Sequence, residues 1–261
     1  MIRPVCEVQK LGLIDYQEAW DLQNQFAAEI AAGDRPATLL LLEHPHTYTF
    51  GRRGDAANLL WDEAELRQRG IAVYWVDRGG DVTYHGPGQL VGYPLLPLAP
   101  GGLQTTPSSG SARLPQADFV GYLRKLEQVL ISALDHFGVV GEQINGLTGV
   151  WVGKQTASST TSLSADSLQN WAKVAAIGVK VDVKGISRHG FALNVNPDMT
   201  FWDGIVGCGL EGYRETSLAE QLDPTPSLTA VRDAVGCAFS DKFWYSIEWR
   251  DTKKVSLLTK N

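Results

Sequence analysis

Apolar residues return every three or four positions over residues 118–137, which is the spacing of one face of an α-helix. Asp118 is a favourable N-cap at the start of this stretch, and Gly138 is a favourable end. The same signals predict three more helices, over residues 16–32, residues 62–69 and Ser227–Phe239.

Short, continuous apolar runs predict buried strands between these helices. The runs are Thr38–Leu42, Ile71–Val76, Leu90–Leu96, Val150–Val152, Val174–Val183 and Phe191–Val195. Pro94 and Pro97 favour an edge position for the end of the third run. The elements do not follow the strict strand–helix–strand rhythm of a doubly wound parallel sheet. We therefore expect an α+β fold, with a mixed or antiparallel sheet and flanking helices.

Two polar stretches interrupt this pattern, at residues 98–116 and 155–170. They carry few large apolar side chains, so their burial cannot offset the entropy of ordering them, and we expect surface insertions. Apolar patterns resume directly on both sides of each stretch. The sequence therefore predicts a single domain over residues 1–261.

The chain has 261 residues, of which 44% are hydrophobic and 20% are charged, as in an ordinary globular protein. Its formal net charge of −6, from 23 basic and 29 acidic residues, argues against a general nucleic-acid-binding protein. No apolar run reaches the roughly 20 residues of a membrane-spanning helix, and the N-terminus lacks the pattern of a signal peptide. We expect a cytoplasmic protein without membrane contact.

The three cysteines differ in their sequence surroundings. They are too few for a disulfide framework, and none forms a Cys-X-X-Cys pair. Cys208 stands between Gly207 and Gly209, which leaves its sulfur accessible and suits a nucleophile. A small buried hydrophobic side chain is an equally good interpretation of Cys208. Cys237 lies among apolar residues of a predicted helix and is expected in the core, and Cys6 lacks a comparable setting.

The densest group of chemically capable side chains runs from Arg78 to Tyr93, with the sequence RGGDVTYHGPGQLVGY. Its glycines allow backbone N–H groups to approach a ligand closely. The spacing matches neither a P-loop nor the dinucleotide motif GxGxxG. A long structural hairpin loop is the alternative, but so many hydrogen-bonding side chains in one loop favour a functional role.

A second cluster combines two histidines with two arginines. His44 and His46 have no third ligand at metal-like spacing, so structural or substrate-positioning roles are favoured and no metal is expected. Arg52 and Arg53 are either a solvated pair or a contact for an acidic partner.

Together, these motifs resemble the lipoyl(octanoyl) transferase (LipB) family. The signature string is Arg78–His85, followed by Gly86-Pro87-Gly88-Gln89. Four other segments resemble family blocks in the family order: Leu42–Gly54, Lys173–Gly178, His189–Asn196 and Cys208-Gly209. The chain departs from the family at Gly207, where the family usually has proline.

This resemblance implies transfer of an octanoyl group from octanoyl-acyl carrier protein to a specific lysine of lipoyl domains, the first step of protein lipoylation. The implied acceptors are the lipoyl domains of 2-oxoacid dehydrogenase complexes and the glycine cleavage H protein. No cofactor is implied. The implied fold is the α+β fold of biotin and lipoate protein ligases.

By position in these motifs, the resemblance implies that Cys208 carries the acyl group as a thioester and that Lys173 is its partner base. On sequence alone, other lysines are equally eligible: Lys154, Lys180 and Lys184. The implied acyl-site residues are Arg78, Gly79, Gly80, Asp81, Val82, Thr83, Tyr84, His85, Ala176, Ile177, Gly178, Gly190, Phe191 and Ala192.

A cysteine and a lysine suit this chemistry because a thioester preserves the activation of the acyl group. An ordinary thiol, with a pKa near ~8.5, is only a few per cent ionised at about pH 7. Lowering that pKa by about 2 units costs roughly 2.7 kcal/mol, and an ammonium about 4 Å away supplies up to ~4 kcal/mol at an effective dielectric of about 20. A neutral His85 is an alternative base, and backbone N–H groups of Gly79–Gly80 or Gly209 are candidates for an oxyanion hole.

Two other functions share parts of the pattern. An ATP-dependent lipoate or biotin ligase of the same fold needs an adenylate site and no nucleophilic cysteine. A non-enzymatic module that binds acyl groups or carrier proteins forms no acyl-enzyme. Because this chain and its implied partners are acidic, docking needs a basic surface, for which the candidates are Arg52, Arg53, Lys184 and Arg188.

Overall fold

The computed structural model describes residues 2–98, 118–153, 170–207 and 214–251. Its α-helices are α1 (Tyr16–Ala32), α2 (Glu63–Gln68), α3 (Phe119–Asp135), α5 (Leu218–Gln221) and α6 (Leu228–Phe243). Its strands are β1 (Val5–Leu13), β2 (Ala37–Glu43), β3 (Thr47–Phe50), β4 (Ala72–Trp75), β5 (Val82–His85), β6 (Gln89–Leu95), β7 (Gly141–Glu142), β8 (Val150–Gly153), β9 (Trp171–Val181), β10 (Ser187–Asn194), β11 (Arg214–Glu215) and β12 (Ser246–Asp251). Apart from Leu98 and Asn170, the predicted insertions lie outside the described residues.

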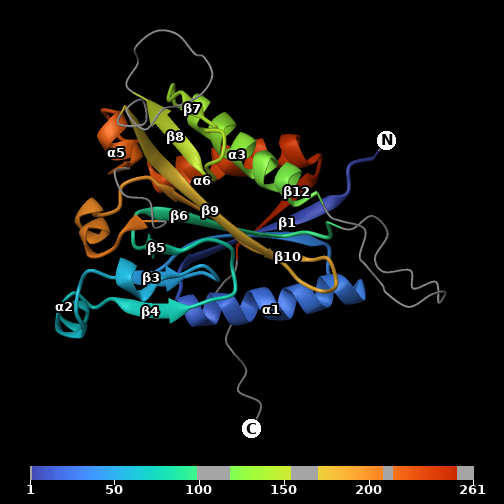
Figure 1. Cartoon of the computed structure of the whole chain (residues 1–261). Coiled ribbons are helices and arrows are strands. Elements are labelled where there is room, and N and C mark those ends of the chain that lie inside the picture. The colour runs from blue at the N-terminus through green and yellow to red at the C-terminus, as the bar shows by residue number, and fades with distance from the viewer. Residues whose placement is uncertain (1, 99–117, 154–169, 208–213, 252–261) are drawn as a thin grey trace.

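A large mixed sheet forms the framework, with the strand order β12-β1-β2-β6-β10-β9-β8-β7 and β11 beside β9. Strand β1 pairs in parallel with β2 and β12, whereas the pairs from β2 to β7 are antiparallel. Figure 1 shows α3 and α6 on one face of this sheet and α1 on the other. The expected α+β class, with a mixed sheet and flanking helices, is confirmed.

Helix α3 covers the main hydrophobic core. The Asp118 carboxylate caps the helix by accepting a hydrogen bond from the N–H of Gly121 (2.7 Å). Leu126, Leu130 and Leu134, all at or near zero exposure, then recur at the helical spacing and pack against the sheet and α6. Burying each such side chain stabilises the fold by roughly 1.5–3 kcal/mol.

Helix α1 covers the opposite face. The Asp15 side chain caps it by accepting from the N–H of Gln17 (2.8 Å), and Gly33 ends it in the left-handed conformation at φ 84°. Leu22 and Phe26 pack against the buried side chains of β2 and β6. None of the helices in the described ranges is long and apolar enough to cross a membrane.

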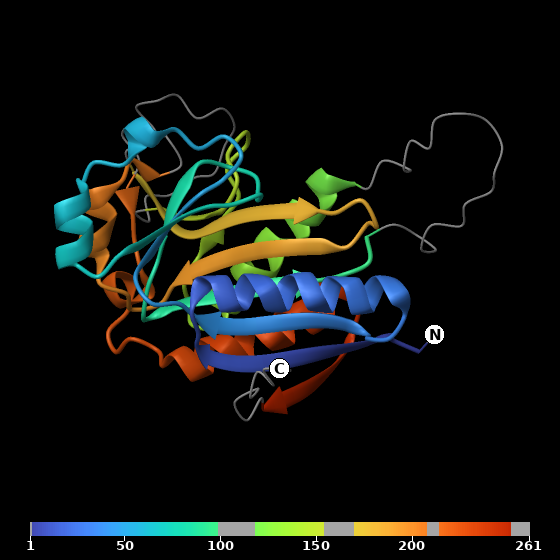
Figure 2. The same ribbon diagram turned by 90° about the horizontal axis from the view of Figure 1, so that it is seen from below.

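A small three-stranded sheet, in the order β4-β3-β5, lies beside the first turn of α1 (Figure 2). Tyr16 of α1 stacks on Tyr74 of β4 with 5.2 Å between ring centroids. The core of this sheet is aromatic: Tyr48 and Tyr84 are fully buried, and Tyr84 stacks on Phe201. The segment expected as one long glycine-rich loop thus contains a strand, β5.

The sequence predicts an edge position for the end of the Leu90–Leu96 strand. Strand β6 as a whole lies inside the sheet between β2 and β10, but its end, Tyr93–Leu95, pairs regularly with β2 alone. Regular pairing with β10 covers only Gln89–Gly92, so Pro94 lies beyond the part of that ladder that needs its missing N–H. Ser187 bridges the remaining gap. Its hydroxyl donates to the carbonyl of Pro94 (2.7 Å) and accepts from the N–H of Leu96 (2.9 Å).

The prediction of a buried Cys237 is wrong, because the side chain is exposed on α6. Its neighbours Val235 and Phe239 face the core, and the 100° step of the helix turns Cys237 outward between them. Cys6, in contrast, is fully buried in β1, and this burial raises the pKa of its thiol to about 12.

Candidate functional site

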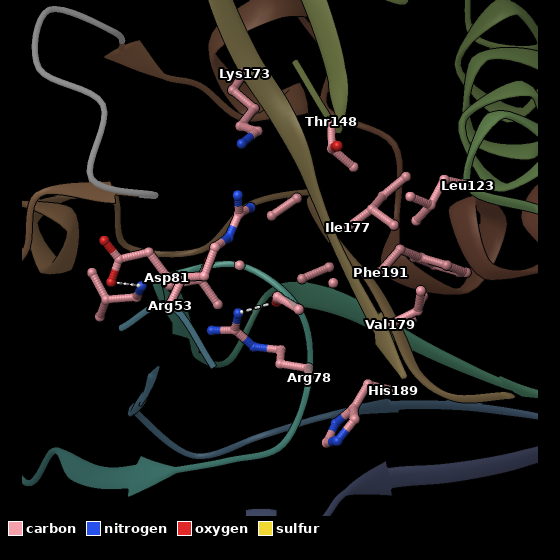
Figure 3. A pocket seen from close by; sticks show the side chains of 18 of the residues that line it. Arg53, Arg78, Asp81, Leu123, Thr148, Lys173, Ile177, Val179, His189 and Phe191 are labelled. Carbon is pink, nitrogen blue, oxygen red and sulfur yellow. Dashed lines mark hydrogen bonds between the residues drawn. The ribbon is translucent and has the colours of Figure 1, made fainter. Parts of the chain in front are cut away.

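A cavity of about 720 Å³ lies along β9 and β10, next to the glycine-rich turn that follows β4 (Figure 3). Its wall combines segments that are far apart in sequence: Arg78–Thr83, residues 146–148, Lys173 with residues 176–179, and His189–Ala192. A cavity of this size accommodates a small-molecule ligand or an acyl chain.

Pairs of small residues lie on the face of the sheet that the turn covers. In the β9–β10 ladder, Gly178 lies opposite Gly190 and Ala176 lies opposite Ala192. The glycine-rich turn rests directly on this surface, since the N–H of Gly79 donates to the carbonyl of Val179 (2.9 Å). Small side chains at these positions leave space between the turn and the sheet.

Hydrogen bonds of Arg78 hold one end of the turn in place. The residue is 7% exposed, and its guanidinium donates through Nη2 to the hydroxyl of Thr49 (2.9 Å) and through Nη1 to the carbonyl of Gly79 (2.9 Å). Asp81 fixes the other end by accepting from the amide of Asn58 (2.5 Å). The turn is therefore held in place by the protein itself before a ligand binds.

Two buried histidines, His44 and His85, lie with their ring centroids 5.6 Å apart, and both are neutral. His44 donates from Nδ1 to the carbonyl of Ile14 (2.8 Å), and burial lowers its pKa to about 4, so Nε2 accepts from the Tyr93 hydroxyl (2.7 Å). Burial also holds the pKa of His85 well below its usual range. Both ring nitrogens of His85 are engaged, by the Gln89 carbonyl oxygen (2.9 Å) and the Thr49 hydroxyl (3.3 Å). This arrangement favours a supporting role for His85 over that of a base.

Asp77 clamps the turn to the β9–β10 hairpin, and the sequence interpretation missed it. Its carboxylate accepts from Nε2 of His189 (2.7 Å), forms an ion pair with Lys180, and lies 3.5 Å from Arg188. The bond from His189 and the nearby cations lower the pKa of Asp77. His189 has an unusual φ of 56°, and its Nδ1 has no hydrogen-bond partner within the described ranges. His189 could have been predicted as a site residue, because it directly precedes Gly190 in the family segment His189–Asn196.

Lys173 lies at the opposite end of the cavity wall from His189 (Figure 3). It is 4% exposed, and its Nζ lies 5.2 Å from the ring centroid of Trp151 on β8, a cation–π distance. Gly149 makes room for it: a Cβ there would lie 2.6 Å from Cε of Lys173 and 2.6 Å from the carbonyl oxygen of Ala175, and φ is 124°. A side chain at position 149 would therefore displace the lysine.

The structure brings Lys173 and nearly all predicted acyl-site residues into this one cavity wall. Those in the wall are Arg78, Gly79, Gly80, Asp81, Val82, Thr83, His85, Ala176, Ile177, Gly178, Gly190, Phe191 and Ala192. Tyr84 is not among them, because the alternation of β5 turns its ring into the small-sheet core, where its hydroxyl bonds to Nδ1 of His46 (2.9 Å). Cys208 lies outside the described residues.

The predicted basic docking residues divide into two groups. Arg52, Arg53 and Lys184 are exposed. Arg188 is largely buried against Asp77, so its charge is already used inside the protein. Arg53 additionally lines the cavity, and Figure 3 shows its guanidinium directed toward Lys173.

Metal ligation was not expected, and the described residues contain no cluster of three or more histidine, cysteine, aspartate or glutamate side chains that could hold an ion. Arg78, Asp81 and His85 of the cavity wall are each held by hydrogen bonds within the protein, to Gly79 and Thr49, to Asn58, and to Gln89 and Thr49 respectively.

Comparison with known proteins identifies relatives over nearly the whole chain. The model of the lipoyl protein ligase A/B catalytic domain matches residues 15–240. An octanoyltransferase of Chloroflexus aurantiacus is 42% identical over 90% of this chain and 93% of its own length. Octanoyltransferases of Rubrobacter xylanophilus and Gloeobacter violaceus are 41% and 43% identical, over 92% and 93% of this chain and 94% and 92% of their own lengths.

Solved structures with the same fold agree with this assignment. A bipartite lipoate protein ligase of Thermoplasma acidophilum superposes with a TM-score of 0.63 at 15% identity, over 96% of this chain and 87% of that one. A lipoate-protein ligase A bound with ATP gives a TM-score of 0.59 at 15% identity, over 96% and 88% of the two chains. The ligase-like fold is shared with both, and the sequence relationship runs to the octanoyltransferases. With its fold, its motifs and its relatives in agreement, the chain belongs to the lipoyl protein ligase A/B catalytic domain family.

Proposed function

We propose that this chain is an octanoyltransferase, which moves an octanoyl group from octanoyl-acyl carrier protein to a lysine of a lipoyl domain through a thioester on Cys208. One observation carries the proposal. Lys173, the glycine-rich turn and the paired small residues meet in a single cavity, in a chain 42% identical to an octanoyltransferase. The role of Cys208 rests on its sequence motif.

The chemistry proposed needs one thiolate and one lysine. The Lys173 ammonium stabilises the Cys208 thiolate, which attacks the thioester carbonyl of the donor, and the carrier thiolate leaves with a proton from Lys173. The neutral Lys173 then takes a proton from the incoming amine as the amine displaces Cys208 and the amide forms. Because the acyl group arrives as a thioester, its transfer needs no ATP.

The acyl chain is proposed to lie between the glycine-rich turn and the small residues Ala176, Gly178, Gly190 and Ala192 of β9 and β10. Ile177 and Phe191 alternate with these residues and line the same cavity from the other face of the sheet. Arg78, Asp81, Val82, Thr83 and His85 would hold the turn above it. Of the two proposed oxyanion donors in the turn, the N–H of Gly79 already bonds to Val179, so the N–H of Gly80 is the better candidate.

The proposed partners are an acyl carrier protein and lipoyl domains, including those of 2-oxoacid dehydrogenase complexes and the glycine cleavage H protein, in the cytoplasm. The ligase of Thermoplasma acidophilum acts with an E2 lipoyl domain, which supports an acceptor of this class. Exposed Arg52, Arg53 and Lys184 supply the positive surface that acidic partners need. We also propose that residues 1–261 act as one acyltransferase domain.

The decisive experiment is incubation of the full chain with octanoyl-acyl carrier protein in the absence of ATP, followed by intact-mass and peptide mass analysis. An octanoyl adduct on Cys208 that hydroxylamine removes, and that a lipoyl domain discharges into an octanoyl-lysine, is expected. A strict requirement for ATP would favour the ligase function, and an acyl group bound without a covalent adduct would favour the binding module.

Cys237 provides a matched control for this experiment, because its side chain is exposed and lies on α6. Cys237→Ser should form the adduct and transfer octanoyl at the wild-type rate. Cys208→Ser should lose transfer by at least about a hundredfold. Equal activity in both variants would exclude the thioester mechanism.

A further inference from the structure

The proposed reaction leaves one proton that Lys173 cannot hold. An incoming lysine arrives as an ammonium and gives up two protons on its way to an amide N–H. Lys173 has one vacancy, because it has given a single proton to the departing carrier thiolate. The second proton must leave the site by another route, so a further acceptor is needed near Lys173.

Glu215 is the neighbour of Lys173 across a strand ladder. Strand β10 pairs with β9 only from Ala175 onward, and β11 takes its place beside the first residues of β9. In this short parallel pair Glu215 is the register partner of Lys173, and the N–H of Thr216 donates to the carbonyl of Lys173 (2.9 Å). Register partners in neighbouring strands lie about 4.8 Å apart with side chains on the same face of the sheet. One water or one rotamer change spans such a gap.

The Glu215 carboxylate also lies beside Gly207, the residue that precedes the proposed nucleophile in sequence. A Cβ on Gly207 would lie 2.5 Å from Oε1 of Glu215. The carboxylate thus occupies the space of a side chain at position 207, next to Trp202. Glu215 is thus both the ladder partner of Lys173 and, through its carboxylate, the neighbour of Gly207.

The charges around Glu215 suit a group that takes up and releases a proton. Burial raises its pKa, and the Lys173 charge lowers it in opposition. Arg214, its neighbour in β11, forms an ion pair with Glu220 of α5, and Glu220 also accepts from the Thr216 hydroxyl (2.7 Å). Among the described residues, Lys173 is the one whose charge lowers the pKa of Glu215. Since Glu215 is half-buried, a proton on it can still pass to solvent.

We propose that Glu215 is the proton outlet of the acyl-transfer site and discharges Lys173 once in each turnover; this inference rests on the proposed function. The neutral Lys173 takes the first proton from the incoming ammonium and passes it to the Glu215 carboxylate, which releases it to water. Lys173 is then neutral again and takes the second proton as the amide bond forms and the bond to sulfur breaks.

The test compares the two half-reactions in Glu215→Gln. Acyl-enzyme formation from octanoyl-acyl carrier protein needs no second base and should stay within about threefold of wild type, whereas transfer to the lipoyl domain at about pH 7 should slow roughly tenfold to hundredfold. The defect should shrink as the pH rises, because more of the acceptor amine then arrives neutral. Added imidazole should restore part of the rate, and Glu215→Asp should retain part of it.

Glu142→Gln serves as the matched control, since Glu142 is exposed on β7 and β8 separates it from β9, and it should behave as wild type throughout. A wild-type transfer rate in Glu215→Gln would overturn the inference. So would an equal, pH-independent loss in both half-reactions, which indicates a structural role, and Glu215→Asp distinguishes these cases if the glutamine variant does not fold. Failure of the wild-type chain to form an adduct would instead reject the proposed function.

Discussion

The two faces of the large sheet are built for different purposes. Beneath α3 and α6 the core consists of aliphatic and aromatic side chains, with Leu126, Leu130 and Phe239 at zero exposure. On the side of the glycine-rich turn, buried positions hold Arg78 and His85, each bonded to Thr49. Burying such groups costs free energy unless each finds a partner. The apolar core under α3 therefore contributes most to the stability of the fold. Part of that stability offsets the cost of burying polar and charged groups on the face of the turn.

The largest expected effect tests the chemical face. Lys173→Ala should lower transfer to the lipoyl domain by about 10³-fold, within the range seen for general acid–base groups. Its melting temperature should change little, since the removed charge was held in a cavity wall rather than in the apolar core. Lys184→Ala, which removes an exposed lysine, is the control and should keep full activity. Transfer assays and thermal melts of wild type, Lys173→Ala and Lys184→Ala measure both quantities. If Lys173→Ala kept its activity, the catalytic base would be a group other than Lys173.

The opposite pattern is expected on the α3 face. Leu130→Ala should destabilise the fold by roughly 2–5 kcal/mol, because it opens a cavity in a fully buried core. The rate per folded molecule should stay close to that of wild type. Urea unfolding followed by activity at low denaturant measures both quantities. A lower rate in fully folded Leu130→Ala would indicate that the two faces are coupled.

A substitution at Gly149 changes both the backbone strain and the position of the proposed catalytic group Lys173. In Gly149→Ala the new methyl group would push Lys173 aside, so transfer should fall about tenfold or more, in addition to the backbone strain at positive φ. Gly146→Ala provides the matched control, because Gly146 also has a positive φ (81°) but has open space around its Cβ position. Similar activity in the two variants would mean that backbone strain at positive φ controls the rate, and not the close contacts of the new methyl group with Lys173 and with the carbonyl oxygen of Ala175.

The smallest effect is expected from the clamp at Asp77, and it depends on pH. The folded-state pKa of Asp77 is lowered, so the stability it contributes is complete above its ordinary pKa of about 3.9 and is lost as the pH falls through the folded value. Asp77→Asn should therefore melt a few degrees below wild type near neutral pH, with a difference that narrows below about pH 4. Asp34→Asn, at an exposed turn, is the control. Thermal melts across this pH range make the comparison, and a difference independent of pH would argue against an ionised clamp.

Prediction from sequence succeeded where one local signal decided the structure. The N-cap Asp118 and the leucines that follow it define α3 because capping and helical spacing act within a few residues, although the helix ends at Asp135, three residues before the predicted end at Gly138. Strands β1 and β12 were missed, since β1 mixes polar and apolar residues and finds its partners only in distant parts of the chain. Cys237 was misplaced because composition alone does not give the angular position of a residue on its helix.

The candidate site also contains residues that the sequence predicted and contacts that it did not. Its residue types were predicted through the family motifs, and the cavity contains all of the described ones except Tyr84. The clamp from Asp77 to His189 and the pairing of Glu215 with Lys173 were not foreseen, because both depend on the register of strands that are distant in sequence. No local pattern of residues reports such a register.

The placement of α6 and β12 has a consequence for how the chain matures on the ribosome. Helix α6 fills the core beneath α3, and β12 covers the outer side of β1, yet both come from the end of the described chain. While the chain is still being synthesised, the leucines of α3 and one edge of β1 remain uncovered. Nascent chains of this protein should therefore bind chaperones until residues 228–251 have left the exit tunnel, and only then become resistant to proteases.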